Sequence, residues 1–381
     1  MEPPRGRHVR LGLPAREGGH REDVPEGPEE EGCLRPRGSL LPGQEQEERD
    51  EAELHGAPGR DDQGGREAPG RGGQRGASIV NGLREALDAW ASKYEGYLDT
   101  GLLVDSILEP LRPSARVNLL RISREELIGD LEGWGIGADP SPYYGRAVFL
   151  EGDPGKLPHH ALGLYYLQEH SAMFPVVVLD PRPGERILDM TAAPGGKATQ
   201  IAEHIGNLGT VVAVERSRRR IKALRANVDR MGAVSVMVVQ GDARSLGFRE
   251  AFDRVLLDPP CSSESSLRKD PWTLPSIRRN APETLSRLQR SLVRAAWRYL
   301  RPGGTLVYST CTFDPRENEG VVSYAVELGF RTLRVDLPFP HERGFREYRG
   351  LEFDPSVSDA ARIMPYHGPF AGMFIAHLLK I

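Results

Sequence analysis

Two cysteines lie where predicted apolar strands end and loops begin. Cys261 closes the sequence DPPC after one apolar run, and Cys311 closes STC after another. In α/β proteins, ligands and reactive groups gather at the carboxyl ends of the strands. A thiol in that place is a candidate nucleophile. The pair therefore indicates an enzyme.

A glycine-rich turn upstream, TAAPGGK, joins an apolar strand to a helix. Glycines let the backbone approach a ligand, and the N–H groups of the helix start face it. The turn fits neither the phosphate loop GxxxxGK(S/T) nor the dinucleotide pattern GxGxxG. A plain strand-to-helix turn is the alternative that the glycines alone leave open.

Acidic residues end three successive predicted strands: Asp189, Glu215 and Asp242. Glu215 stands about twenty residues after the glycines, where an acid binds a ribose diol. Asp242 is placed to meet an adenine amino group. So many carboxylates suit S-adenosylmethionine better than a phosphate ligand, and the turn is therefore predicted to bind this cofactor.

Two thiols beside a methyl donor suggest chemistry on a pyrimidine. A thiolate that adds to C6 makes C5 nucleophilic enough to accept a methyl group. Asp258 would assist at N3, and a second thiol would assist the elimination. The alternative for either cysteine alone is a buried small apolar residue. A zinc site is not indicated, because CxxC and HxxxH spacings are missing.

Length and composition suit a reduced, cytoplasmic protein with two domains, or with one large domain and an appendage. The chain has 381 residues, three cysteines and a net charge of −4. It has no apolar run near the ~20 residues that span a bilayer, so no membrane association is expected.

Residues 1–77 hold the acidic excess and no aromatic residue. They are predicted to be a disordered tail, or an over-long gene start, in which Cys33 has no role. Basic clusters at 216–225 and 268–279 are either RNA contacts or solvated surface.

Residues 78–158 are predicted to form a small α+β domain. It would contain a helix from residue 79 to 90, a strand over 116–121, a helix opened by the capping box Ser123/Glu126, and a strand over 147–150. Residues 159–381 alternate strand and helix patterns, which predicts a mostly parallel sheet covered on both faces. The predicted strands are 186–190, 211–215, 234–239, 254–257, 304–309 and 372–379, and the predicted helices are 197–205, 218–231, 284–300 and 317–327.

The motifs GLYYLQEHSAM, DMTAAPGGK, LLDPPCS, RKDP, VYSTCTFDPRENE and PYHGPFAGMF together resemble RNA cytosine-C5 methyltransferases, the superfamily of the Nop2/Sun proteins and the bacterial 16S rRNA m5C enzymes. The resemblance covers about residues 100–381. It implies a Rossmann-like class I S-adenosylmethionine-dependent methyltransferase. It also implies that Cys311 is the nucleophile and that Cys261 assists product release. The DPPC motif alone would resemble DNA cytosine-C5 methyltransferases, which use that cysteine as the nucleophile.

The resemblance also implies further site residues. Catalysis would use Lys197 and Asp258, with Lys197 orienting Asp258, and no metal. Cofactor binding would use Ala192, Ala193, Pro194, Gly195, Gly196, Lys197, Glu215, Arg220, Asp242 and Asp258. The domain at 78–158 resembles the RNA-recognition-like extension of the family. Two positions depart from the family pattern: Ser263 replaces a usual glycine, and Ala198 a usual threonine.

The expected function is therefore S-adenosylmethionine-dependent methylation of RNA at cytosine C5, by a monomer whose partner is rRNA or tRNA. The RKDP and GLYYLQE segments favour rRNA. One alternative is a DNA methyltransferase that uses Cys261. Another is a non-catalytic RNA-binding or ribosome-assembly factor, against which the presence of Cys311 argues.

Overall fold

The computed structural model describes residues 72–277 and 281–381. Most of the tail predicted at 1–77, with Cys33, lies outside these residues. Helix α2 spans Gly72–Ala91, so it overlaps the end of that predicted tail.

The helices are α2 (Gly72–Ala91), α3 (Thr100–Leu108), α4 (Arg124–Gly133), α5 (Pro158–Ala161), α6 (Phe174–Leu179), α7 (Gly196–His204), α8 (Arg220–Met231), α9 (Leu274–Ile277), α10 (Pro282–Tyr299) and α11 (Glu319–Glu327). The strands are β1 (Ser114–Val117), β2 (Ala138–Pro140), β3 (Ala147–Leu150), β4 (Tyr165–Leu167), β5 (Arg186–Asp189), β6 (Thr210–Glu215), β7 (Val236–Gln240), β8 (Phe252–Leu257), β9 (Leu300–Thr310), β10 (Phe330–Leu333), β11 (Glu342–Arg343), β12 (Glu347–Tyr348), β13 (Leu351–Glu352), β14 (Ala361–Ile363) and β15 (Met373–Lys380).

The large sheet has the order β11-β14-β15-β9-β8-β5-β6-β7, with β10 also paired to β15. Strands β7, β6, β5, β8 and β9 run parallel. Strand β15 is antiparallel to β9, and β10 and β14 are antiparallel to β15. The predicted α/β fold is confirmed, although the sheet is mixed rather than mostly parallel.

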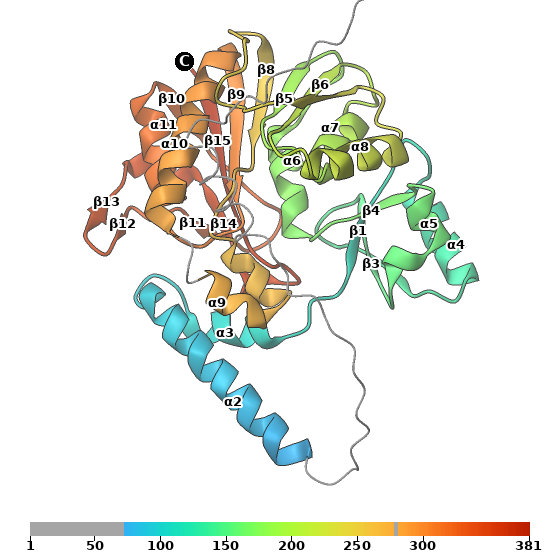
Figure 1. Cartoon of the computed structure of the whole chain (residues 1–381), viewed down its shortest axis with the longest axis vertical. Coiled ribbons are helices and arrows are strands. Elements are labelled where there is room, and N and C mark those ends of the chain that lie inside the picture. Colours follow the sequence, from blue (N-terminus) through green and yellow to red (C-terminus); the bar gives the residue numbers. More distant parts are fainter. Residues whose placement is uncertain (1–71, 278–280) are drawn as a thin grey trace, which may run out of the picture. The chain divides into compact units, whose positions relative to one another are not determined.

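Helices cover both faces of this sheet (Figure 1). Side chains alternate along a strand, so Ile187 and Leu188 of β5 point to opposite faces. Ile187 packs in the cluster that includes residues of α6 and α7, and Leu188 packs in the cluster with residues of α10 and α11. Burial on both faces fixes the register of β5 and hence the position of the turn that follows it.

A second, antiparallel sheet has the order β2-β3-β1-β4 and packs against α4. The predicted capping box is confirmed, because Ser123 and Glu126 satisfy each other's backbone N–H groups. Strand β4 belongs to this sheet but lies beyond residue 158. The predicted domain boundary therefore does not coincide with an edge of the sheet.

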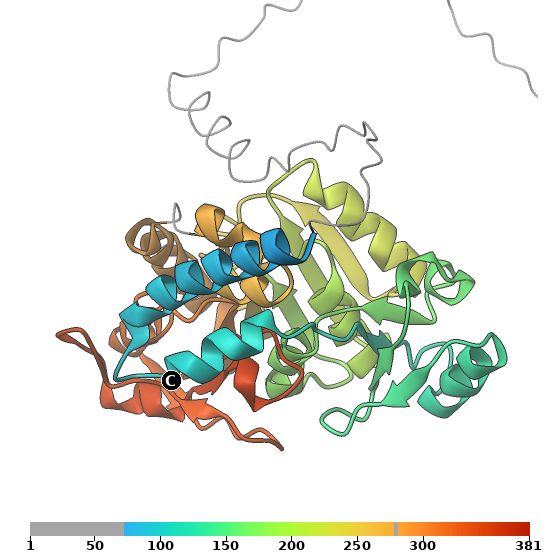
Figure 2. The same cartoon turned by 90° about the horizontal axis from the view of Figure 1, so that it is seen from below.

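Helices α2 and α3, which precede the small sheet in the sequence, contribute to a different hydrophobic cluster from that sheet. Leu87 and Trp90 of α2, and Leu103 of α3, share a buried cluster with Leu267 and Phe313 of the loops after β8 and β9. Figure 2 shows α2 (blue) and α3 (cyan) side by side in front of the rest of the fold. Helices α2 and α3 thus support the loops of the thiols, although the sequence grouped them with the small domain.

The strand predicted over 116–121 ends at Val117. The physical reason is Asn118, whose side-chain amide donates to the carbonyls of Gly163 and Met231 at 2.8 and 2.9 Å. Its side-chain oxygen accepts from the Leu120 N–H at 3.2 Å, which turns the chain.

Among the described residues, no helix is both long and apolar enough to cross a bilayer.

Candidate active site

The two thiols meet at the ends of neighbouring strands. Strands β8 and β9 are parallel and paired, with Leu257 opposite Tyr308. The loops that follow bring Cys261 Sγ to 3.2 Å from Cys311 Sγ, and both cysteines are free. The expectation that these strands are adjacent is confirmed.

The two thiols differ in acidity. The hydrogen bond from Cys261 lowers the pKa of Cys311 to about 7, helped by Ser263 and Lys197 and opposed by burial. The same contact raises the pKa of Cys261 well above its usual value, and burial adds to this. Because the thiolate is the nucleophilic form, Cys311 is the better prepared thiol.

Glu264 holds the two cysteine loops together. Its buried carboxylate accepts from the Phe313 N–H at 2.9 Å and from the Thr312 hydroxyl at 3.1 Å. It also accepts from Tyr94 at 2.6 Å and pairs with Lys93 at 2.5 Å, so the segment after α2 takes part.

Glu317 is hydrogen-bonded to the loop that contains Cys261. Its Oε2 accepts from the Ser262 N–H at 3.1 Å and from the Gln289 amide at 2.8 Å. Burial raises the pKa of Glu317 to about 7. Its Oε1 is buried without a hydrogen-bond partner in the part of the chain that the structure describes.

Asp258 is fixed from two sides. Lys197 Nζ lies 2.5 Å from its Oδ2, and the Ser309 hydroxyl donates to its Oδ1 at 3.2 Å. Lys197 comes from the first turn of α7, whereas Asp258 and Ser309 come from the strand ends that precede the thiols. The contact between Lys197 and Asp258 is present, and the orienting role of Lys197 stays a prediction.

The glycine-rich turn packs closely on α8. Gly195 has φ +111°, and a Cβ there would approach the Leu224 side chain to 3.1 Å. A side chain at this position would therefore be both strained and crowded. Arg220 donates to the carbonyl of Ala193 at 2.7 Å, and Asn227 donates to that of Pro194 at 2.9 Å.

Arg116 of the small sheet reaches the same turn. This fully buried guanidinium donates to the carbonyl of Gly196 at 2.7 Å, to Gln168 at 2.6 Å and to Glu203 at 3.0 Å. The small sheet therefore fixes the start of α7.

The acids that end β5 and β6 lie beside the turn. Burial raises the pKa of Asp189 to about 7, and its Oδ2 has no hydrogen-bond partner among the described residues. Glu215 accepts from the Ser217 N–H at 2.7 Å and lies 3.6 Å from Arg220. S-adenosylmethionine fits this set, because its hydroxyl and ammonium groups are donors for which carboxylates are the natural acceptors.

Asp242 follows β7, next to Gly241, whose N–H donates to the carbonyl of Glu215 at 3.1 Å. Its carboxylate is held by Arg244, with Nη2 at 2.5 Å from Oδ2, and this hydrogen bond lowers the pKa of Asp242. The predicted contact with adenine therefore competes with Arg244, and it stays a prediction.

The predicted basic clusters have different environments. Arg218, Arg219, Lys222 and Arg225 are exposed at or near α8. Arg268 is buried instead and donates to the carbonyls of Gly368 and Phe370 at 2.8 and 2.6 Å, so it is a structural cation rather than surface. Arg278 and Arg279 lie outside the described residues.

The sequence did not single out Glu264, Glu317, Ser309 or Arg116. Their partners lie far along the chain, as with Tyr94 and Glu264, 170 residues apart. The one feature of the sequence that could have pointed to a role for Glu264 and Glu317 is their charge, in segments whose other residues show no functional pattern. Among the described residues there is no cluster of three or more His, Cys, Asp or Glu suited to a metal ion.

The fold, the glycine-rich turn and the acids at successive strand ends define a class I, S-adenosylmethionine-dependent methyltransferase. Residues 176–379 match the family described as 16S rRNA methyltransferase RsmB/F. The chain belongs to this family. The fold, the cofactor and the enzyme class, an RNA methyltransferase, are thereby confirmed.

Two curated relatives are similar over most of the chain. The tRNA (cytosine(49)-C(5))-methyltransferase of Pyrococcus abyssi is 38% identical over 72% of this chain and 90% of its own length. Ribosomal RNA small subunit methyltransferase F of Erwinia tasmaniensis is 37% identical over 71% of this chain. The matched region covers only 58% of that relative's own length.

A solved structure shares the fold. NSun6 from Pyrococcus horikoshii, crystallised with SFG, superimposes with a TM-score of 0.66 at 25% identity, over 77% of this chain and 97% of that one.

Proposed function

We propose that this protein transfers a methyl group from S-adenosylmethionine to C5 of a cytosine in RNA, through a covalent bond between Cys311 and C6. The observation that carries the proposal is the pair of thiols 3.2 Å apart at adjacent strand ends. Beside them, Asp258 is held by Lys197 at 2.5 Å. A thiolate and an anchored acid are the two groups that addition to a pyrimidine requires.

In the first step, the Cys311 thiolate forms a bond to C6. Electron density moves toward N3, where the Asp258–Lys197 pair holds the proton that neutralises it. Position C5 gains enamine character and becomes the nucleophile. S-adenosylmethionine supplies the electrophilic methyl group.

Release reverses the addition. The C5 proton passes to water, the C5–C6 double bond forms again, Cys311 leaves as a thiolate, and N3 returns its proton to the Asp258–Lys197 pair. Cys261 keeps its proton more firmly than Cys311, because the pKa of Cys261 is raised and that of Cys311 is lowered. It can therefore donate a hydrogen bond to the departing thiolate, which is its proposed role in product release.

The remaining cofactor assignments are part of the proposal. Glu215 would bind the ribose diol and Asp242 the adenine amino group. The backbone from Ala192 to Gly196 would pass beside the ligand, with Arg220 fixing the turn. The contact of Arg220 with Ala193 at 2.7 Å supports its place there.

For the substrate we propose rRNA, supported by the RKDP and GLYYLQE segments and by the family match. A tRNA is the second candidate, favoured by the archaeal relative, of which the chain covers 90%. A monomer in the cytoplasm completes the proposal, since two free, adjacent thiols suit a reducing compartment.

Bisulfite sequencing of total RNA, from cells with and without the gene, tests both the reaction and the substrate. One cytosine that loses protection when the gene is deleted, and regains it with the wild-type gene but not with Cys311→Ala, supports the proposal. Protection restored equally by Cys311→Ala would overturn the assignment of the nucleophile.

A further inference from the structure

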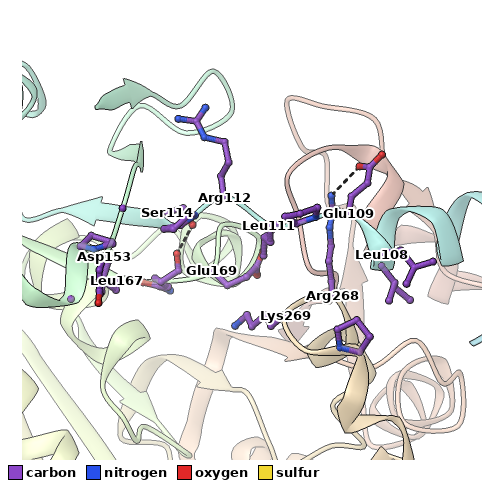
Figure 3. A pocket seen from close by; sticks show the side chains of 18 residues that line it. Leu108, Glu109, Leu111, Arg112, Ser114, Asp153, Leu167, Glu169, Arg268 and Lys269 are labelled. Carbon is purple, nitrogen blue, oxygen red and sulfur yellow. Dashed lines mark hydrogen bonds and ion pairs between the residues drawn. The ribbon is translucent and has the colours of Figure 1, made fainter. Parts of the chain in front are cut away.

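A cavity of about 700 Å³ has a lining that does not include the thiols; Figure 3 shows its walls. It is bordered by the linker from α3 to β1, by the small sheet and by the loop that continues from Cys261. Its apolar wall includes Leu108, Leu111 and Leu167, and its cations include Arg112 and Lys269. The volume is within the ~300–1,000 Å³ typical of ligand sites.

The cavity adjoins both parts of the active site. The short helix η4 (Glu264–Arg268) runs from the Cys261 loop to the cavity wall. On another wall, Gln168 accepts from Arg116 at 2.6 Å, and Arg116 donates to the carbonyl of Gly196 at 2.7 Å. A strand of RNA that delivers a cytosine to Cys311 would therefore have this cavity as a neighbour.

Most charged side chains of the wall have a polar partner, and Glu109 lies 3.9 Å from Arg268. Arg112 pairs with Asp139 at 2.7 Å, and Asp153 pairs with Lys156 at 2.8 Å. Glu169 accepts from three backbone N–H groups, among them that of Ala371 at 2.8 Å. Buried Arg268 binds backbone carbonyls, as described above.

Lys269 differs from these charged residues in its surroundings. Its side chain is exposed, and among residues 72–277 and 281–381 it has neither an ion pair nor a side-chain hydrogen bond. Figure 3 shows it between the side of the cavity with Asp153 and Leu167 and the side with Leu108 and Arg268. Beside an apolar surface the wall thus presents a lysine without a carboxylate partner among the described residues, a group that can contact a phosphate.

We propose that this cavity holds a nucleotide that flanks the target cytosine, with Lys269 on its phosphate and its base against the leucine wall. The inference rests on the proposed function. A cytosine that reaches the half-buried Cys311 thiol must leave its stack, and in single-stranded RNA its unpaired neighbours need a surface of their own.

Salt-dependent binding tests the proposal with the full chain. The probe is a fluorescent, single-stranded RNA of roughly twelve nucleotides with one central cytosine, within the ~4–16-nucleotide range of single-strand sites. We expect Lys269→Ala to make the slope of log Kd against log salt shallower by about 0.7, the value for one lost phosphate contact. Lys269→Arg should restore the slope. The control Arg331→Ala removes an equal charge from an exposed position of strand β10 and should leave the slope unchanged.

Truncating the RNA locates the contact. If the RNA is shortened to the cytosine from the side that enters the cavity, wild type and Lys269→Ala should bind with the same slope. An unchanged slope in Lys269→Ala, or a difference that survives truncation from either side, would overturn the inference. Methylation of the probe by wild type is measured separately, so failure of the proposed function is distinguished from failure of the Lys269 contact.

Discussion

The sulfur atoms of Cys261 and Cys311 are 3.2 Å apart, although the residues are 50 positions apart in sequence. The short contact makes the two thiols chemically unequal, because a hydrogen bond that one donates stabilises the thiolate of the other. The pKa of Cys311 falls to about 7, whereas that of Cys261 rises. This inequality gives the proposed order of events, with Cys311 attacking and Cys261 assisting release.

Cys261→Ala should trap the enzyme on its substrate. Without the assisting thiol, elimination of Cys311 slows. At alkaline pH, where loss of the Cys261 hydrogen bond no longer limits the Cys311 thiolate, addition to C6 continues, so a protein–RNA adduct should accumulate. The measurement is a denaturing gel of protein mixed with labelled RNA and S-adenosylmethionine. Cys311→Ala is the matched control and should give neither adduct nor methylation. Normal turnover by Cys261→Ala with no adduct would remove the release role.

The methylation rate should rise with pH and level off. Because the pKa of Cys311 is lowered to about 7 by the hydrogen bond from Cys261, its thiolate fraction grows through neutral pH and is nearly complete about one unit above. Single-turnover rates over about pH 6 to 9 measure this. A rate that is constant or falling across that range contradicts a Cys311 thiolate as the attacking group.

Glu215→Ala should weaken S-adenosylmethionine binding. If the carboxylate accepts from the ribose hydroxyls, its loss removes charge-assisted hydrogen bonds of about 1.5–3 kcal/mol, roughly a ten- to hundredfold change in Kd. Isothermal calorimetry with wild type and Glu215→Ala measures the change. Glu327→Ala, on the exposed side of α11, is the matched control. Equal affinities of Glu215→Ala and wild type would refute the ribose contact.

Glu317→Gln should remove part of the pH dependence of stability. Burial raises the pKa of Glu317 from 4.5 to about 7, so the folded state holds this proton more tightly than the unfolded state. Its contribution to stability is therefore complete below about pH 4.5 and is lost as the pH rises to about 7. The advantage of Glu317→Gln over wild type should grow across this window by up to about 3 kcal/mol, since one pKa unit is ~1.4 kcal/mol.

Urea unfolding at about pH 5 and pH 8 measures this difference. Asp189, whose pKa is also raised to about 7, is present in both proteins and cancels in the comparison. If the difference between the two proteins is the same at both pH values, Glu317 does not hold a proton in the folded state.

The part of the site that the sequence predicts is the part encoded by local patterns. The turn around Gly195 and the two cysteines each follow an apolar strand directly, so their positions at the sheet edge follow from the order of elements. The pairing of β8 with β9 then brings the cysteines together.

The supporting residues could not be predicted in this way. Glu264 reaches Tyr94, and Arg116 reaches Gly196, across 170 and 80 residues of sequence. No periodicity links such partners. They depend on how α2 and the small sheet pack against the catalytic strands, which short patterns do not encode. The same packing explains why Arg268, predicted to be surface, is buried.

Ser263 is a strained residue beside the thiols. It adopts φ 59° and ψ 35°, a left-handed conformation that costs a residue with a side chain roughly 1 kcal/mol. Its hydroxyl donates to the Cys261 carbonyl at 3.2 Å and lies 3.8 Å from the Cys261 sulfur. The Ser263 side chain also lowers the pKa of Cys311, although less than the Cys261 thiol does. The strain therefore coincides with a hydroxyl that favours the attacking thiolate.

Replacement of Ser263 should separate strain from chemistry. Ser263→Gly removes both the strain and the hydroxyl, so thermal stability should hold or rise by up to about 1 kcal/mol while the pH midpoint of methylation moves to higher pH. Ser263→Ala removes only the hydroxyl, so it should shift the midpoint equally without the gain in stability. Melting curves and single-turnover pH profiles of the two variants measure this. If the pH midpoint stays at its wild-type value in both variants, the Ser263 hydroxyl does not act on Cys311. The strained conformation of Ser263 then makes no contribution to catalysis.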